Sequence, residues 1–257
     1  MVIQFSIQNN VAKIILNRPD KFNSFNKEMA LSLQGILDDC AENDDVRAIV
    51  ISGNGKAFCA GQDLDEATDP NGPSLNSIVG EHYNPIILKI RNIEKPIIAA
   101  VNGVAAGAGA NIALACDIVI ASESAKFIQA FSSIGLIPDS GGTYFLPRLI
   151  GIQKSLALMM TGDRISAKEA EDMNMIYKAI PDDQFSSFVD EFASKIASMP
   201  TKGLVLTKKA VNASFDNTLK EQLYLEEKLQ SVAGNTFDFK EGTAAFLAKR
   251  KPIFKGK

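Results

Sequence analysis

The stretch PIIAAVNGVAAGAGANIALAC, from Pro96 to Cys116, carries no charged residue, and its interpretation decides the fold. It is about long enough to cross a membrane as a helix. However, Asn102, Asn111 and several glycines interrupt it, and it divides into two patterns. PIIAAV is typical of a buried strand, whereas GANIALACD is typical of a short helix. We therefore predict a strand, loop and helix inside an α/β core, not a membrane span.

The composition is that of an ordinary globular chain. It has 257 residues, 46% hydrophobic and 22% charged, which suits one large domain or two small ones. The net charge is −3, and the only dense basic block is the tail AKRKPIFKGK, so a nucleic-acid partner is not expected. The start, MVIQFSIQNN, lacks the features of a signal peptide.

The cysteines and the single histidine narrow the chemistry. Cys40, Cys59 and Cys116 are odd in number and never in CxxC spacing, which predicts a reduced, cytoplasmic protein without disulfides. His82 is the only histidine, so a His-rich metal site is excluded, and so is any His-dependent triad not built on it. We interpret His82 as a loop or helix-end residue.

Hydrophobic periodicity predicts an N-terminal α/β part. Residues 2–19 predict two strands around the Asn9-Asn10 turn, and a helix follows with Asn26 as its N-cap. Further strands are predicted for VRAIVIS, PIIAAV, DIVIA and AKFIQA, and a helix for residues 78–93. GNGKAFCAGQDL and NGVAAG are predicted as glycine loops, and ATDPNGPSLNS as a mobile loop.

From about Gly141 the chain is predicted to be nearly all helical. SAKEAEDMNM begins with a capping-box pattern, Ser166 followed by Glu169, and YKAIP predicts one short strand. Amphipathic helices follow in DDQFSSFVDEFASKIASM, KGLVLTKKAVNAS, TLKEQLYLEEKLQSVAG and FKEGTAAFLAKR. A helical appendage therefore completes the α/β part.

Two glycine loops could present free backbone N–H groups. GVAAGAGAN lacks the third glycine of a dinucleotide-binding fingerprint and the Gly-Lys-Ser/Thr of a P-loop. It does supply a tight turn that opens a helix, where free N–H groups favour negative charge. KAFCAGQDL also follows a strand, and two such loops can aim two donors at one oxygen as an oxyanion hole. The alternative for both is an ordinary packing turn.

GLIPDSGGT places one carboxylate, Asp139, in an apolar stretch. Burial among Phe131, Ile134, Leu136 and Ile137 would raise its pKa and make it a better base. Alternatively, Asp139 or Ser140 caps a helix that starts near Gly141. The residues alone leave both interpretations open.

KAFCAGQDL, KPIIAAVNGVAAGAGANIALACDIVIAS, AKFIQAFSSIGLIPDSGGT, LPRLIG and FLAKRKP occur in this order, and together they resemble the crotonase superfamily of enoyl-CoA hydratases and isomerases. The resemblance covers essentially the whole chain. It implies an α/β fold, a spiral of ββα repeats over residues 1–197, and a helical region over residues 198–257 that drives assembly into a trimer or hexamer. It also implies an acyl-CoA substrate, with coenzyme A as part of the substrate and no separate cofactor.

The resemblance also implies roles for particular residues. The oxyanion-hole donors would be the backbone N–H groups of Gln62 and Ala108, and Asp139 would be catalytic. The residues implied to contact coenzyme A are Lys21, Ala60, Asp63, Leu64, Phe246 and Lys249. The last two would reach the nucleotide of a neighbouring subunit.

The chain departs from the hydratase pattern at two positions. Asn111 and Phe131 stand where hydratases of this superfamily carry catalytic glutamates. Asp139 stands where its isomerases carry an aspartate that acts as the base, and where its dehalogenases carry an aspartate that acts as the nucleophile. The motifs look most like the group of 1,2-epoxyphenylacetyl-CoA isomerases of bacterial phenylacetate degradation, which also shift enoyl-CoA double bonds from C3 to C2. The alternatives are a hydratase, a dienoyl-CoA isomerase, a thioesterase, or a non-enzymatic acyl-CoA-binding or RNA-associated scaffold.

Overall fold

A computed structural model describes all residues 1–257, and its main layer is a six-stranded sheet in the order β1-β2-β3-β5-β7-β10. The strands are β1 (Ile3–Gln8), β2 (Val11–Leu16), β3 (Ala48–Gly53), β5 (Ile97–Val101), β7 (Ile118–Ser122) and β10 (Lys178–Ile180). The pair β1 and β2 is antiparallel around Asn9 and Asn10, which have φ angles of 52° and 62°. All other pairs of this sheet are parallel.

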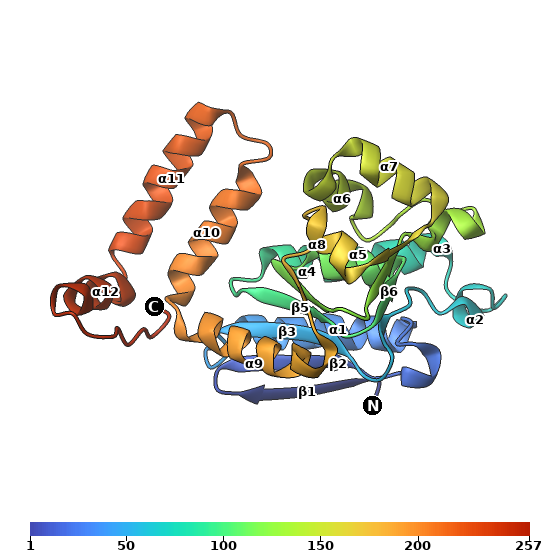
Figure 1. Ribbon diagram of the computed structural model, residues 1–257, viewed down its shortest axis with the longest axis horizontal. Helices are drawn as coiled ribbons and strands as arrows, with labels where there is room; N and C mark the ends of the chain where they lie inside the picture. Colours follow the sequence, from blue (N-terminus) through green and yellow to red (C-terminus); the bar gives the residue numbers. More distant parts are fainter.

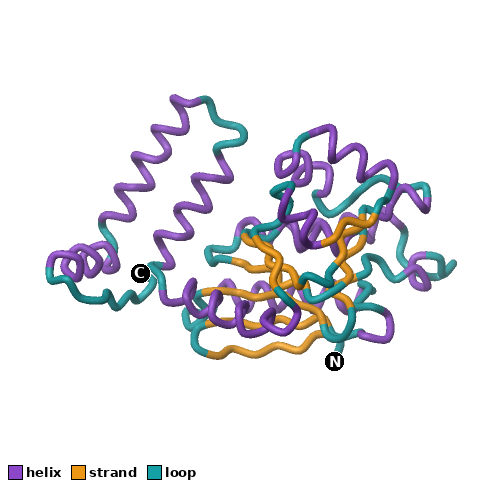
Figure 2. Tube along the Cα trace, in the orientation of Figure 1, coloured by secondary structure: helices purple, strands orange, loops and turns teal.

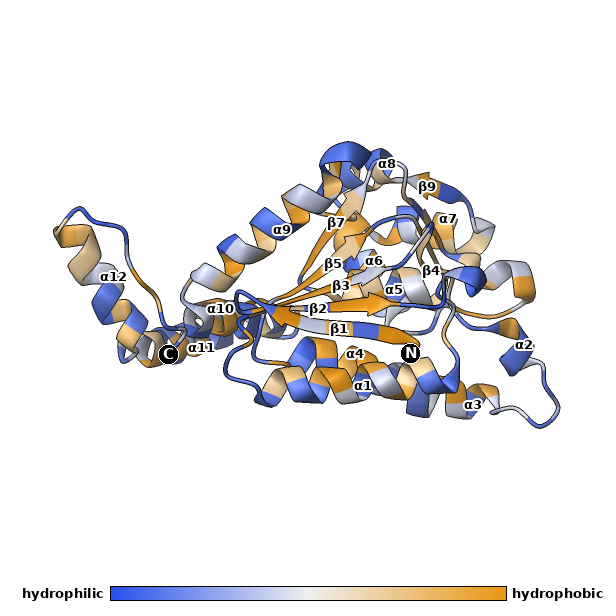
Figure 3. Cartoon of the chain, turned by 90° about the horizontal axis from the view of Figure 1, so that it is seen from below, coloured by the Kyte–Doolittle hydropathy of each residue, from blue (hydrophilic) through white to orange (hydrophobic).

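Helices cover both faces of this sheet (Figures 1 and 3). α1 (Lys27–Glu42) and α4 (Asn84–Asn92) lie on one face, and α9 (Asp182–Ser198) lies on the other. Alternate residues of β3 therefore enter two separate apolar clusters, with Ile49 and Ile51 in the larger and Val50 in the smaller. The prediction of Asn26 as the N-cap of α1 is confirmed, because its side chain accepts a hydrogen bond from the Met29 N–H.

A second, four-stranded sheet was not predicted as such. It consists of β4 (Ala57–Cys59), β6 (Val104–Ala106), β8 (Lys126–Ile128) and β9 (Arg164–Ser166). The segments GNGKAFCAGQDL and NGVAAG, predicted as loops, contain β4 and β6, so that prediction is wrong for their central residues. The physical reason is length, because strands of three residues are too short to show an alternating pattern.

The opening stretch folds as β5, β6 and the buried helix α5 (Ala108–Ala115). No helix in the chain has both the length and the apolar character that a membrane crossing requires. The three cysteines are free and buried. Cys59 lies in β4, and Cys116 follows α5.

The helix predicted over residues 78–93 is two helices in series. A π-helix, η2 (Ile78–Tyr83), precedes α4 and buries both His82 and Tyr83. His82 lies in the last turn of η2, as the helix-end interpretation predicts, and its side chain is buried. π-Helices such as η2 often occur at functional sites. Three short helices precede η2 in the chain: η1 (Pro19–Lys21), α2 (Leu64–Ala67) and α3 (Leu75–Ser77).

The segment after β8 forms η3 (Ala130–Ile134), α6 (Gly142–Ile150), α7 (Ile152–Thr161) and α8 (Ala167–Asp172). The predicted capping box of Ser166 and Glu169 is confirmed at the start of α8. The last three helices, α10 (Thr201–Ala213), α11 (Leu219–Gly234) and α12 (Phe237–Leu247), extend away from the sheets (Figures 1 and 2).

Buried polar contacts hold this helical arm to the sheets. The Lys208 Nζ atom of α10 donates to Asp117 Oδ2 at 2.9 Å and to the Ile90 carbonyl at 2.9 Å. The Arg47 side chain donates to the Phe254 carbonyl at 3.0 Å and to the carbonyl of Met199, the residue after α9, at 2.6 Å, so the C-terminal tail folds back towards the end of α9. α11 contains no buried residue.

Candidate active site

One cavity of about 470 Å³ lies between the two glycine loops and the segment that carries Asp139. The residues predicted from the resemblance that line it are Ala60, Gln62, Leu64, Ala108 and Asp139. Its walls are mostly apolar, and Asp139 is the only acidic residue among those that line it. An apolar cavity with one carboxylate is suited to moving a proton within an apolar substrate.

The first glycine loop along the chain, KAFCAGQDL, leaves the backbone N–H of Gln62 free. The Phe25 N–H donates to the Gly61 carbonyl at 2.7 Å, and the Asp63 N–H donates to the Phe25 carbonyl at 2.8 Å. These two bonds make a parallel bridge opposite Gln62. In such a bridge the intervening residue points its own N–H to the other side.

The second glycine loop supplies the other donor. Ala108 is the first residue of α5, so its N–H has no acceptor within the helix. A Cβ atom placed on Gly61 would lie 3.4 Å from the Ala108 nitrogen, so the two loops are in direct contact. The structure therefore brings the Gln62 and Ala108 donors to one end of one cavity.

Close packing of α5 on β4 keeps the loops together. A Cβ atom on Gly109 would lie 2.3 Å from the Cys59 carbonyl oxygen and 2.7 Å from its Sγ atom. Only glycine allows this approach. The contact fixes the height of the first turn of α5 relative to the first glycine loop.

The side chain of Gln62 is also fixed. The Tyr83 hydroxyl donates to Gln62 Oε1 at 2.9 Å, and the Tyr83 ring packs edge-on against Phe25 with centroids 5.9 Å apart. Burial raises the pKa of Tyr83 well above its usual value, so its hydroxyl stays protonated and remains a donor. Sequence reasoning did not identify this contact.

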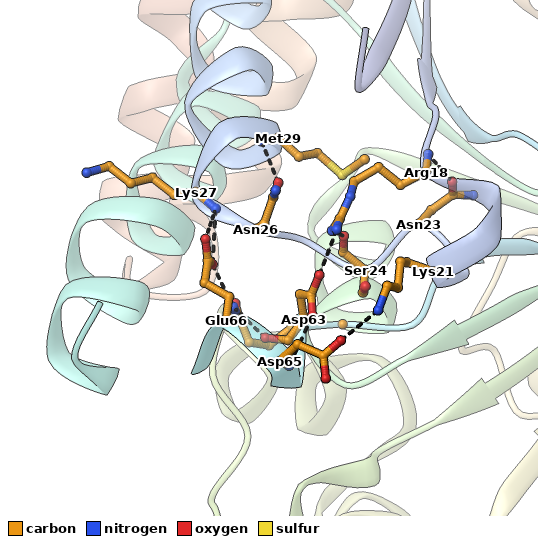
Figure 4. Close-up of polar contacts among 12 residues, drawn as sticks. Arg18, Lys21, Asn23, Ser24, Asn26, Lys27, Met29, Asp63, Asp65 and Glu66 are labelled. Atoms are coloured by element: carbon orange, nitrogen blue, oxygen red, sulfur yellow. Dashed lines mark hydrogen bonds and ion pairs between the residues drawn. The ribbon is translucent and has the colours of Figure 1, made fainter. Parts of the chain in front are cut away.

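A buried ion pair holds the start of α2 (Figure 4). Arg18 Nη2 lies 2.7 Å from Asp63 Oδ2, and Asp63 Oδ1 accepts the Asp65 N–H at 3.1 Å as the helix N-cap. Burial raises the pKa of Asp63, but the hydrogen bond and charge of Arg18 outweigh it and hold that pKa below its usual value. Both oxygens of the Asp63 carboxylate are thus already bound, one by Arg18 and the other by the Asp65 N–H.

Lys21 lies on the surface beside this ion pair. Its Nζ atom is 2.6 Å from Asp65 Oδ2, and both side chains are exposed (Figure 4). An exposed pair of this kind is weak, so an anionic ligand could draw Lys21 away.

Asp139 lines the cavity and is a stronger base than an exposed aspartate. Burial raises the pKa of its carboxyl group, while a 2.9 Å hydrogen bond from the Ser140 hydroxyl lowers it by less. α6 begins after Gly141, which makes no side-chain cap, so the alternative of Asp139 or Ser140 as N-cap is wrong. The turn is instead made by Gly141 in the left-handed conformation.

The apolar surroundings of Asp139 differ from the prediction. Phe131 is buried, but Ile134, Leu136 and Ile137 are 54%, 39% and 81% exposed. These three residues line the cavity as its open rim. An apolar ligand at this rim would cover them.

Phe246 and Lys249 lie far from this cavity in the same chain. Phe246 is 83% exposed on α12, and Lys249 follows the end of that helix. α12 and α2, which contributes Leu64 and Ala67 to the cavity, are at opposite ends of the molecule (Figure 1). Within one chain the structure does not bring these two residues to the site.

The cavity brings together two backbone N–H groups and one carboxylate, an arrangement that can serve a class of enzymes that stabilise an oxyanion beside a proton-transferring group. Residues 6–257 match the enoyl-CoA hydratase/isomerase family. The chain is 45% identical to the 1,2-epoxyphenylacetyl-CoA isomerase of Escherichia coli (strain K12), over 98% of this chain and 97% of that protein. It is 42% identical to a probable enoyl-CoA hydratase of Rhodobacter capsulatus, over 99% and 98%.

Among solved structures, the enoyl-CoA hydratase of Bacillus anthracis superposes with a TM-score of 0.93 at 34% identity, over 100% of both chains. The chain therefore belongs to the enoyl-CoA hydratase/isomerase family, with the crotonase fold, and is an enzyme of that family.

Proposed function

We propose that the protein is an acyl-CoA isomerase in which Asp139 moves a proton along the acyl chain. The observation that carries this proposal is that Asp139 is the only acidic residue lining the cavity. The Asp139 carboxylate would remove a proton from C2 of a 3-enoyl thioester and return it at C4, which shifts the double bond to C2. The negative charge that develops on the thioester oxygen would be stabilised by the N–H groups of Gln62 and Ala108.

The substrate that fits this proposal best is 1,2-epoxyphenylacetyl-CoA, which would rearrange to the oxepin. The similarity to the Escherichia coli isomerase supports it, and so do the apolar walls of the cavity, which suit an aryl or alkyl group. The epoxide reaction would use the same base and the same oxyanion donors. The direct test is whether purified protein isomerises 3-enoyl-CoA or the epoxide, followed by absorbance.

The second candidate is an enoyl-CoA hydratase, which the name of the Rhodobacter capsulatus relative favours. We expect hydration of crotonyl-CoA to be slow, because Asn111 and Phe131 replace the two acids that would activate the water and deliver a proton to C2 of the substrate. The measurement is loss of the conjugated-enoyl absorbance, with isomerisation by the same preparation as the control. Hydration at a turnover number typical of efficient hydratases would reject the isomerase assignment.

We also propose that residues 198–257 assemble the protein into a trimer or a hexamer. The arm exposes large apolar side chains at Phe215, Leu219, Leu223, Tyr224 and Leu247, more than a solvated arm needs. Light scattering at micromolar concentration should give three or six chain masses. A stable monomer would disprove the assembly.

Lys249 is proposed to contact coenzyme A bound to a neighbouring subunit. The variant Lys249→Ala should then raise KM about tenfold, the effect of losing one charge-assisted hydrogen bond, with kcat nearly unchanged. Lys168→Ala, which removes an exposed lysine paired with Asp172, is the matched control. A fall in kcat at constant KM would contradict the proposed contact.

A further inference from the structure

Two buried amide side chains connect β8 to the backbone of Asp139. Asn111 of α5 is fully buried, and its Nδ2 atom donates to the Asp139 carbonyl oxygen at 2.9 Å. Its Oδ1 atom accepts a hydrogen bond from Gln129 Nε2 at 2.8 Å. Gln129, which follows β8, is 2% exposed. The two amides therefore form one chain of hydrogen bonds inside the protein.

The direction of this chain is determined by its end. A carbonyl oxygen only accepts, so Asn111 must turn its NH₂ group towards Asp139 and its oxygen towards Gln129. Gln129 must then donate through Nε2, and its Oε1 atom is left as the one buried side-chain oxygen without a partner. An unpaired buried acceptor is destabilising. The unpaired oxygen of Gln129 is therefore the consequence of holding the amide of Asn111 in one orientation.

Gly142 completes the arrangement around the Asp139 carbonyl. Its N–H donates to the same oxygen at 2.8 Å, so both lone pairs of the oxygen are used. A Cβ atom at Gly142 would lie 2.3 Å from Asn111 Nδ2, so no larger residue fits beside the amide. Ser140 is held at a φ of 51°, from where its hydroxyl donates to the Asp139 carboxylate. The backbone and the side chain of Asp139 are both restrained.

We propose that Asn111 is a positioning residue for Asp139: it fixes the backbone of the base through its amide, with Gln129 behind it. This inference rests on the proposed function of Asp139 as the base. Asn111 does not line the cavity, so it acts through Asp139 and not on the substrate. An ionised carboxylate at position 111 would repel the carbonyl and add a second negative charge near the base. The amide therefore positions the base without placing a second negative charge near it.

The variant Asn111→Asp tests this role because it keeps the shape and removes the amide donor. We expect kcat for isomerisation to fall about 10–100-fold, with KM within about twofold, since misplacement of a base affects the transition state more than binding. The acid limb of the kcat profile should move to higher pH. Tyr83 is the neighbouring titratable group whose pKa is raised by burial and by the charge of Asp139, and it stays neutral. α5, which carries Asn111, has no titratable residue.

Asn23→Asp is the matched control, because Asn23 is also fully buried and also donates to backbone carbonyls, those of Asn54 and Ala57. It should lower the melting temperature without moving the acid limb. If Asn111→Asp does not fold, Gln129→Met, which removes only the restraint on Asn111, should lower kcat about three- to tenfold at constant KM.

The outcomes separate this inference from the proposed function. Folded Asn111→Asp or Gln129→Met enzyme with unchanged kcat and acid limb, alongside an inactive Asp139→Asn enzyme, would overturn the positioning role alone. Full activity of Asp139→Asn would overturn the proposed function and this inference with it.

Discussion

Asp139→Asn should lower the rate of enoyl-CoA isomerisation by roughly 10²–10⁴, the usual contribution of a positioned general base. Asparagine keeps the shape of the side chain and can still contact Ser140, but it cannot accept a proton from carbon. Binding of acyl-CoA should persist, because the proposed oxyanion donors belong to the backbone of other segments. The measurement is kcat by absorbance together with affinity by calorimetry.

The same variant should fold at least as well as the parent at neutral pH. Burial raises the pKa of Asp139 in the folded state, so the folded state binds this proton more tightly than the unfolded state does. Ionisation of Asp139 therefore lowers stability as pH rises from its unfolded pKa through its folded one. The asparagine side chain of the variant would not carry this penalty, and α6 is not capped by this residue. A variant that is inactive only because it unfolds would contradict the catalytic role.

The raised pKa also predicts the pH profile of the parent. The kcat value should fall on the acid side, with a midpoint above about 4, the ordinary value for aspartate. The Asp139→Asn enzyme should have lost this limb. An unchanged acid limb in its residual activity would assign the proton transfer to another group.

Gly109→Ala should reduce kcat about 10²–10³-fold, the range found when one oxyanion-hole donor is lost. The new methyl group would lie 2.3 Å from the Cys59 carbonyl oxygen, which is backbone and cannot swing aside. Either α5 or β4 must move, and Ala108 or Gln62 moves with it. Overpacking of this kind typically costs about 1–3 kcal/mol of stability.

Gly35→Ala is the control for the same chemical change. Gly35 lies in α1 with no atom near its prospective Cβ, so alanine should keep full activity and stabilise the helix by roughly 0.5–1 kcal/mol. Folded Gly109→Ala enzyme with parental kcat would show that the donors tolerate a displaced α5.

The large elements of the fold could be predicted from the sequence because each is long enough to show a period. The strands around Asn9 and Asn10 alternate, and α1 repeats its apolar residues on one face. The π-helix η2 could not be distinguished from the α-helix that follows it, because both bury the same apolar side of the segment.

The strands of the second sheet could not be predicted from the local pattern of apolar residues. Its strands contain three residues each and acquire their structure from pairing with strands distant in sequence, as β4 does with β6. Asp139 and the two glycine loops could be found from residue type and resemblance. The Arg18–Asp63 pair and the Asn111–Gln129 chain could not, because they depend on contacts between distant segments.

The rate at which the three buried thiols react with an alkylating reagent reports local opening of the native enzyme. Burial raises the pKa of Cys40 to about 11 and of Cys59 to about 12, and it raises that of Cys116 as well. Alkylation needs both thiolate and access, so labelling proceeds only when a segment opens. Cys59 lies beneath the first glycine loop, where Gly61 N–H points to its sulfur. Its labelling rate therefore reports how often the two glycine loops that carry the proposed oxyanion donors come apart, and protection by bound acyl-CoA would measure how far substrate slows that opening.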